Sequence, residues 1–297
     1  LLYGALTVVC GFGLWALGMT PFQAVNHAMT TTATGGFGTE NDSLSGFHSG
    51  VKLWVIMFMV ICGISFPLYI TMIRTRTLSP LRRHEETWWY LGIIVASSAF
   101  VLIEHEVQQF DETPINIVFN LVAIITTTGY AVGDYDSWPL LGKEVVLLMM
   151  VVGGCSGSTS GGLKVSRFIL WIRFSRIELT RAFRPRVVMR QTLNGRPIPD
   201  GAMGQLFVVL SMATFAFVAG SLAMHIFEPE SSSVSCLSAV ISSIGNIGPA
   251  FADFGPTKNF SQLSTPSTLM LPMLMILGRL EFVAVLVLFS RKLWRRY

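Results

Sequence analysis

Long apolar runs alternate with short polar segments along the whole chain. Five of the runs are close to the ~20 residues that a helix needs to cross a bilayer; they are residues 2–18, 50–73, 88–103, 203–227 and 266–290. A sixth apolar segment, residues 141–172, is interrupted by the sequence GGCSGSTSGG. The pattern predicts an all-α integral membrane protein that crosses the bilayer several times.

Three polar, glycine-containing stretches lie between the apolar runs. Their sequences are TTATGGFGTE, ITTTGYAVGD and VISSIGNIGP, at residues 31–40, 125–134 and 240–249. Each follows a proline that stands 14 to 16 residues before Gly35, Gly129 or Gly245; the prolines are Pro21, Pro114 and Pro229. Proline suits the first turn of a helix, and Thr20 and Thr113 are candidate N-caps. The spacing predicts a short helix before each glycine.

The short helices are too short to cross the membrane. Ten to twelve helical residues span only ~15–18 Å, about half a bilayer, so each is predicted to be a re-entrant half-helix followed by a returning polar segment. Non-helical backbone at this depth is tolerated only where it is buried in protein or lines water. Glycine lets carbonyls turn inward, and rings of carbonyls can replace the hydration shell of an ion. The alternative, ordinary outer loops that happen to repeat, does not explain the matched proline spacing.

The charged residues are few and unevenly distributed. Hydrophobic residues make up 52% and charged residues 13% of the chain, against about 25% charged in soluble domains. Three segments, residues 74–87, 164–196 and 291–297, hold 17 of the 21 Lys and Arg. By the positive-inside rule these segments and the C-terminus are cytoplasmic, and the glycine stretches face outside. Topology therefore explains the basic charge without a nucleic-acid partner.

Acidic residues collect near the glycine stretches. They include Glu40, Asp42, Asp134, Asp136 and Asp253. Carboxylates at the mouth of a pore raise the local concentration of cations. The charge pattern thus agrees with a cation pathway that opens to the outside.

The sequence GGCSGSTSGG, residues 153–162, contains five glycines and four Ser or Thr residues. Such a segment does not hold a membrane helix well, and its free backbone groups need protein or water as partners. It follows the second glycine stretch, so we expect it in the inner half of the pore. It is either a simple kink with a packing role or a mobile intramembrane gate.

Arg279 lies inside the apolar sequence LMILGRLEFVAVL. An arginine in the middle of a membrane helix costs about 2.5–3.5 kcal/mol and usually faces a polar interior. Its expected partners are carbonyls or hydroxyls of residues 153–162, although snorkelling to an interface is the alternative. Glu281 is expected on another face, paired with a different segment. Lys164 either helps to hold the loop or marks the cytoplasmic side.

The chain resembles the membrane subunits of the Trk/Ktr potassium uptake family, closest to the TrkH branch. The resemblance rests on TATGGFGTENDS, TTTGYAVGDYDSWP, GGCSGSTSGGLK, SSIGNIGP and GRLEFVAVLVLF. It implies four helix–pore-helix–helix repeats around one pore, of which three are seen here. They would be the second, third and fourth repeats, at residues 1–75, 76–196 and 197–297. The chain is thus expected to lack its N-terminal part and the first repeat.

The resemblance also implies site residues. Potassium would bind at a filter formed by Thr34, Gly35, Gly36, Thr128, Gly129, Tyr130, Ile244, Gly245 and Asn246. The filter glycines would be Gly35, Gly129 and Gly245. The gate would be formed by the loop at residues 153–162, by Lys164 and by the buried Arg279. Its loop residues would be Gly153, Gly154, Ser156, Gly157, Gly161 and Gly162.

Partners follow from the same resemblance. The family's membrane subunits sit as dimers in the bacterial inner membrane, on cytosolic nucleotide-binding regulatory subunits of the TrkA type. This chain has no glycine-rich phosphate loop followed by Lys and Ser or Thr. Nucleotide would therefore act only through the partner, and potassium would be the transported ion. The expected docking surface is residues 173–196, together with the loop at residues 74–87.

Two other classes of protein have features in common with this sequence. GCSG resembles the serine motif of rhomboid-type intramembrane proteases, with Ser156 as nucleophile. That chemistry needs a histidine within hydrogen-bond reach, and only His27 is expected in the membrane, on the outer side. Secondary transporters also use broken helices near the midplane. Three outer half-helices in parallel orientation and one inner break favour a pore instead.

Overall fold

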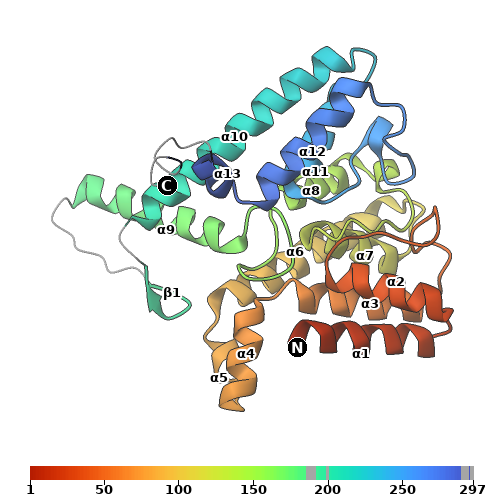
Figure 1. The fold of residues 1–297 in the computed structure, drawn as a ribbon, viewed down its shortest axis with the longest axis horizontal. Helices are drawn as coiled ribbons and strands as arrows, with labels where there is room; N and C mark the ends of the chain where they lie inside the picture. Colours follow the sequence, from red (N-terminus) through yellow and green to blue (C-terminus); the bar gives the residue numbers. More distant parts are fainter. Residues whose placement is uncertain (185–191, 199–200, 289–293, 295–297) are drawn as a thin grey trace.

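The computed structural model describes residues 1–184, 192–198, 201–288 and 294 (Figure 1). Its helices are α1 (Leu2–Ala16), α2 (Pro21–Thr32), α3 (Ser49–Cys62), α4 (Phe66–Thr75), α5 (Ser79–Arg82), α6 (Glu85–Gln108), α7 (Pro114–Ile125), α8 (Leu140–Val151), α9 (Val165–Phe183), α10 (Ala202–Phe227), α11 (Ser233–Gly245), α12 (Thr265–Arg279) and α13 (Val283–Leu288). Two single 3₁₀ turns are η1 (Tyr135–Ser137) and η2 (Ala252–Phe254). The all-α fold class is thus confirmed.

Two of the described helices are long and apolar enough to cross a bilayer unaided, α6 and α10. Both carry large exposed apolar side chains along their length, including Val95, Phe100, Phe207 and Phe215, as expected for surfaces that face lipid. The predicted single span at residues 50–73 is wrong. It consists of α3 and α4, which meet at an angle of 84° after Cys62.

The predicted continuous span at residues 266–290 is also wrong. Helix α12 ends at Arg279, and α13 restarts at Val283. Glu281 and Phe282 between them have φ values of 58° and 57°, a left-handed conformation that bulky residues rarely adopt and that stops a right-handed helix. The remainder of this span and most of the basic C-terminal segment lie outside the described residues.

The three short helices form where prolines and caps predict them, with one difference. The side chain of Thr20 caps α2 in a reciprocal capping box with Gln23. Helix α7 follows Thr113, which makes no side-chain cap bond. Helix α11 does not begin at Pro229 as predicted, but at Ser233, because the Ser232 side chain accepts a hydrogen bond from the Ser235 amide. Serine supplied the actual N-cap.

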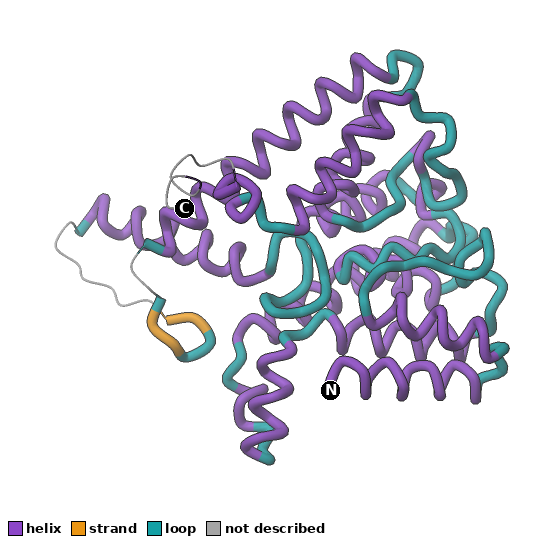
Figure 2. The backbone as a smooth tube through the Cα atoms, viewed as in Figure 1, coloured by secondary structure: helices purple, strands orange, loops and turns teal. Residues whose placement is uncertain are grey.

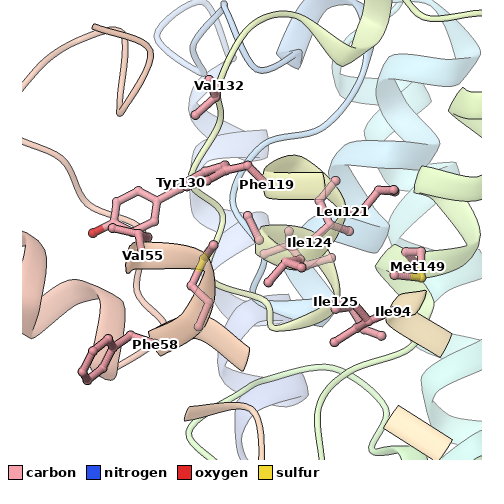
Figure 3. Packing of buried hydrophobic residues seen from close by; sticks show 14 of the residues in the cluster. Val55, Phe58, Ile94, Phe119, Leu121, Ile124, Ile125, Tyr130, Val132 and Met149 are labelled. Atoms are coloured by element: carbon pink, nitrogen blue, oxygen red, sulfur yellow. The ribbon is translucent and has the colours of Figure 1, made fainter. Parts of the chain in front are cut away.

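Helix α7 is at the centre of the larger core. It packs against α3, α6 and α8, and nearly all of its residues from Ile117 to Ile125 are buried. Figure 3 shows Phe119, Leu121, Ile124 and Ile125 among their neighbours. Helices α10, α11 and α12 pack together around a separate apolar cluster, and α11 also contacts α8. The division into repeats at residues 1–75, 76–196 and 197–297 stays a prediction.

The basic segment at residues 173–196 contains the end of α9 and a small hairpin. Strands β1 (Thr192–Leu193) and β2 (Arg196–Pro197) pair antiparallel through a turn at Asn194 and Gly195, both with positive φ, as in the Asn-Gly hairpin turn. It is the only sheet in the described part of the chain. Residues 185–191 of the predicted docking surface lie outside that part.

Candidate functional site: three glycine segments above an intramembrane loop

The three glycine stretches share one backbone pattern after their helices. A left-handed residue comes first, with φ of 52° to 55°, and two residues later a glycine with positive φ. The left-handed residues are Thr34, Thr127 and Asn246, and the glycines are Gly36, Gly129 and Gly248. A β-branched threonine in this conformation is strained. Because the pattern occurs three times, it identifies structurally equivalent positions.

By this pattern the equivalent glycines are Gly36, Gly129 and Gly248, whereas the predicted filter glycines are Gly35, Gly129 and Gly245. Which of them bind an ion stays a prediction. Gly245 is the last residue of α11, and Ile244 lies inside that helix, so Gly248 is the residue equivalent to Gly129. Gly35 stands between the left-handed Thr34 and Gly36, so Gly36 is the equivalent glycine in the first stretch. A shared signal was present in the sequences TGGF, TTGY and NIGP. Aligning the glycine before the aromatic residue or proline would have found both positions.

The glycines allow neighbouring segments to touch. A Cβ atom added at Gly36 would lie 1.9 Å from the carbonyl oxygen of Thr128, and one at Gly129 would lie 1.8 Å from that of Ile247. No side chain fits at such a distance, so glycine is required at both positions for steric as well as conformational reasons. The three segments therefore lie in succession, each glycine against the residue before the next glycine.

Each half-helix holds its own returning segment through polar side chains. Thr30 of α2 donates to the Phe37 carbonyl at 2.9 Å. Asn120 of α7 is buried and makes two bonds to Val132, donating to its carbonyl at 2.6 Å and accepting from its amide at 2.9 Å. In α11, the Ser242 hydroxyl accepts from the Gly248 amide at 3.1 Å. The sequence analysis did not single out these three residues.

The side chain of Tyr130 lies between the second segment and α2. Its ring is buried beside Phe119 (Figure 3), and its hydroxyl is 2.6 Å from the Thr30 hydroxyl, 3.2 Å from that of Thr31 and 3.3 Å from Nδ1 of His27. The side chain thus ties the second segment to α2. A hydroxyl engaged in this way positions the segment, so any contact of Tyr130 with an ion would come from its backbone.

The loop between α8 and α9 lies at the centre of the molecule (Figure 2). Its two ends are joined, because the Gly153 amide donates to the Leu163 carbonyl at 2.8 Å and the Val165 amide to the Gly154 carbonyl at 3.2 Å. Its middle enters the break between α3 and α4. There the Cys155 amide donates to the Gly63 carbonyl at 2.9 Å. The bend in the predicted span 50–73 therefore provides backbone partners for the loop.

The loop also contacts two of the glycine segments directly. The Thr34 hydroxyl donates to the Thr159 carbonyl at 2.9 Å, and the Gly161 amide donates to the Thr127 hydroxyl at 2.5 Å. A Cβ added at Gly161 would lie 2.4 Å from the Gly245 carbonyl oxygen. The left-handed threonines thus join the ends of α2 and α7 to the loop.

Two cations lie at the loop. Arg279 donates to the Thr159 carbonyl at 2.9 Å, and the buried Lys164 donates to the Ser160 carbonyl. The predicted contact of Arg279 with the loop is confirmed, but its predicted buried position in mid-helix is wrong. It is the exposed last residue of α12, and with Lys164 and Glu281 it lines a cavity of about 280 Å³ under residues 157–162.

Glu281 pairs with another segment, as predicted. Its carboxylate lies 2.6 Å from Arg167 of α9. This pair joins the break between α12 and α13 to the helix that follows the loop. Arg279, at the end of α12, thus contacts the loop itself. Glu281, just after α12, contacts the helix that follows the loop.

The loop does not contain a serine hydrolase site in the described residues. The Ser156 hydroxyl lies 2.5 Å from the hydroxyl of Ser166. The His27 ring is bonded to Tyr130 and Thr39 instead, and none of the five histidines hydrogen-bonds to Ser156. The Ser156 amide donates to the Glu86 carboxylate at 2.6 Å, a contact that sequence reasoning missed.

An aspartate caps the outer end of α11. Asp253 of η2 accepts hydrogen bonds from the Ser235 hydroxyl at 2.6 Å and from the Ser232 amide at 3.2 Å. These hydrogen bonds, that of Ser235 first, lower the pKa of the Asp253 carboxyl from its ordinary value, and Lys258 adds to the effect. Asp253 is therefore an ionised residue near the third segment.

The family profile described as TrkH, cation transport protein, matches residues 2–296. This match covers nearly the whole chain. The chain belongs to the TrkH family. As a family of transport proteins, it differs in kind from the intramembrane proteases considered above.

Named relatives agree with this assignment. The chain is 31% identical over 300 residues to the Trk system potassium uptake protein TrkH of Escherichia coli K12, covering 99% of this chain and 61% of that protein. It is 32% identical over 302 residues to TrkI of Halomonas elongata, covering 98% and 61%. The TrkH family chain thus spans about three fifths of the length of these relatives.

A solved structure has the same fold. The crystal structure of the potassium transporter TrkH from Vibrio parahaemolyticus matches with a TM-score of 0.88 and 27% sequence identity, over 99% of this chain and 63% of that one. The agreement extends to the whole described architecture and supports an all-α, membrane-embedded protein.

Proposed function

We propose that this chain forms most of a potassium-uptake pore in a bacterial inner membrane. The observation that carries the proposal is the threefold backbone pattern, in which Gly36, Gly129 and Gly248 each follow a half-helix and the segments touch in succession. Carbonyl groups of such segments can replace the hydration shell of an ion. The names of the relatives, which are potassium uptake proteins, support potassium as the ion.

The half-helices contribute to ion binding through their orientation. Each ends just before its glycine segment, so its negative C-terminal end is directed at the proposed binding region. The outer acidic residues, among them Asp134 and Asp136, would attract cations to the mouth. The ion-binding residues would be those around the equivalent glycines, namely Thr34, Gly35, Gly36, Thr128, Gly129, Tyr130, Asn246, Ile247 and Gly248.

Residues 153–162 would act as the gate. The loop hydrogen-bonds to two of the glycine segments and to Arg279, so in this conformation it would occupy the inner end of the proposed pathway. Two cations beside it, Arg279 and Lys164, would raise the electrostatic barrier to a passing cation. Movement of the loop away from Thr34 and Thr127 would open the path.

Control of the gate would come from the cytoplasm. The full protein would act as a homodimer in lipid, bound to a cytosolic nucleotide-binding subunit of the TrkA type. The basic residues at 173–196, with the loop at residues 74–87, would form the docking surface. Nucleotide would act only through that subunit.

The test is cation flux through the full-length protein in liposomes. We expect potassium and rubidium to pass much faster than sodium, with Gly248→Ser reducing this preference more than Gly245→Ser. Serine at position 248 must adopt a φ of 115°, which L-residues rarely do, whereas position 245 is helical. Absence of any cation flux in the presence of the regulatory subunit would contradict the proposal. A larger loss of potassium preference in Gly245→Ser than in Gly248→Ser would contradict Gly248 as the filter glycine.

A further inference from the structure

Glu86 is a buried carboxylate that the proposed transport mechanism does not use. It is the second residue of α6, lies inside one of the basic segments, and is only 1% exposed. Burying a carboxylate is costly unless it is paired or hydrogen-bonded. Among the described residues, no Lys, Arg or His lies within salt-bridge distance of it. Its partners must therefore be found among neutral groups.

Those partners are two backbone amides, one within the gate loop and one just after it. The Ser156 amide donates to Oε1 of Glu86 at 2.6 Å, and the Ser166 amide donates to the same atom at 3.1 Å. Ser166 is in the first turn of α9, where amides have no partner within the helix and the helix dipole favours an anion. Hydrogen bonds to an ionised acceptor are the stronger kind. One oxygen thus holds the start of the loop against the helix that follows it.

The same residue is bonded to the cytoplasmic hairpin. The Glu86 amide donates to the Asn194 side-chain oxygen at 3.2 Å. Its neighbour Glu85 pairs with Arg173 of α9, which also donates to the Thr192 carbonyl. The first turn of α6 therefore contacts the hairpin on one side and the gate loop on the other.

We propose that Glu86 is a positioning residue that fixes the gate loop to the start of α9 and couples it to the hairpin at residues 192–197. A partner that displaces the hairpin would shift the first turn of α6, and with it the acceptor of the Ser156 and Ser166 amides. The inference rests on the proposed gating role of residues 153–162, but the position of the loop can be measured without any flux.

The first experiment is hydrogen–deuterium exchange of the full-length protein in detergent, followed in a peptide that covers residues 153–168. We expect Glu86→Gln to speed exchange there by about threefold and Glu86→Ala by about tenfold, because glutamine keeps a weaker acceptor and alanine has none. The peptide covering α2 should not change. Glu178→Gln is the matched control, since Glu178 is an exposed carboxylate of α9 that pairs with Arg181.

A substitution in the hairpin itself tests its link to the gate loop. Asn194→Gly removes the acceptor of the Glu86 amide but keeps the left-handed turn that Asn194 makes at φ of 52°. We expect exchange at residues 153–168 to rise by about twofold. This variant also keeps the inference testable if Glu86→Ala does not fold. Unchanged exchange in Asn194→Gly would overturn the coupling to the hairpin.

Measuring cation flux in liposomes distinguishes the positioning role of Glu86 from gating by the loop. Faster exchange together with higher basal flux in the Glu86 variants supports both. Faster exchange with unchanged flux supports the positioning role and contradicts gating by the loop. Unchanged exchange in both Glu86 variants overturns the inference, even where Arg279→Ala raises flux and so supports the gate.

Discussion

The glycine segments and the loop at residues 153–162, the proposed gate, are both glycine-rich backbone, but they are held in different ways. Each segment is bonded to its own half-helix, as Asn120 is to Val132. The loop is bonded to parts of the chain that are far away in sequence, including Gly63, Glu86 and Arg279. These local bonds hold each segment to its own helix, and contacts such as that of Tyr130 with Thr30 join the segments to one another. Distant bonds make the position of the loop depend on several helices at once.

The glycines of the segments and those of the loop also differ in what they pack against. In the segments, Gly36 and Gly129 face carbonyls of the neighbouring segments at distances that exclude any side chain. In the loop, Gly153 faces the Gly161 carbonyl across the loop itself, and only Gly157 and Gly162 have positive φ. The segments therefore need glycine to fit together, whereas the loop needs it both to fold back on itself, at Gly153, and to approach the end of α11, at Gly161. We infer that the segments form a fixed structure and the loop a movable one.

The largest expected effect is that of Gly129→Ser. The added Cβ would overlap the Ile247 carbonyl, and φ of 78° adds strain, which together cost ~1–3 kcal/mol. We expect the preference for potassium over sodium to fall by about tenfold in liposome flux. Gly46→Ser is the matched control, since a Cβ at Gly46 meets no described atom within 4 Å. An unchanged ion preference would mean that the second segment does not contact ions.

A smaller effect is expected at the loop, from Arg279→Ala. It removes one charge-assisted bond to the Thr159 carbonyl and leaves that of Thr34 in place. Because Arg279 is exposed, the loss is ~1 kcal/mol, and we expect basal flux to rise about fivefold without a change in ion preference. Arg181→Ala serves as control, because Arg181 is exposed on α9 and pairs with Glu178. A change in preference without a rise in flux would place Arg279 with the segments rather than with the gate.

Apolar run length and proline spacing sufficed to predict the fold class, the half-helices α2 and α7, and the break between α8 and α9. They did not predict the helix ends after Cys62 and at Arg279. The bend after Cys62 depends on bonds to Cys155 and Gly157, and the end of α12 depends on left-handed Glu281 and Phe282. The first break did carry a local signal, because Gly63 ends α3 and Pro67 lies in the first turn of α4. Hydropathy gives no weight to such a signal, so hydropathy alone could not find either position.

At the site, counting from the prolines misplaced two glycines. The count from Pro229 reached Gly245, but α11 starts at Ser233 and runs to Gly245, so the equivalent glycine is Gly248. In the first stretch, two adjacent glycines left the choice between Gly35 and Gly36 to backbone conformation. The sequence analysis did not single out Glu86. Its proposed role depends on contacts with Ser156 and Ser166, which are 70 and 80 residues away.

The smallest effect is expected at the outer end of the third segment, from Asp253→Asn. Asp253 caps α11 through Ser232 and Ser235, a local bond of the kind that distinguishes the segments from the loop. Its lowered pKa means that its contribution to stability is fully present above the ordinary Asp pKa of about 3.9 and is lost as pH falls through the lower value in the folded protein. At neutral pH we expect the melting temperature to fall by about 1–3 °C.

The measurement is thermal unfolding of the full-length protein in detergent at neutral pH and at acidic pH. The difference between wild type and Asp253→Asn should narrow as pH falls below the ordinary pKa of aspartate, because the wild-type carboxyl then becomes protonated and loses its advantage. Asp42→Asn is the control, since Asp42 has no side-chain hydrogen bond or ion pair within the described ranges. Basal flux should fall by the same small amount in both variants, because each loses one carboxylate near the glycine segments. A rise in flux with Asp253→Asn would show that the third segment moves with the gate and would break the distinction between fixed segments and a movable loop.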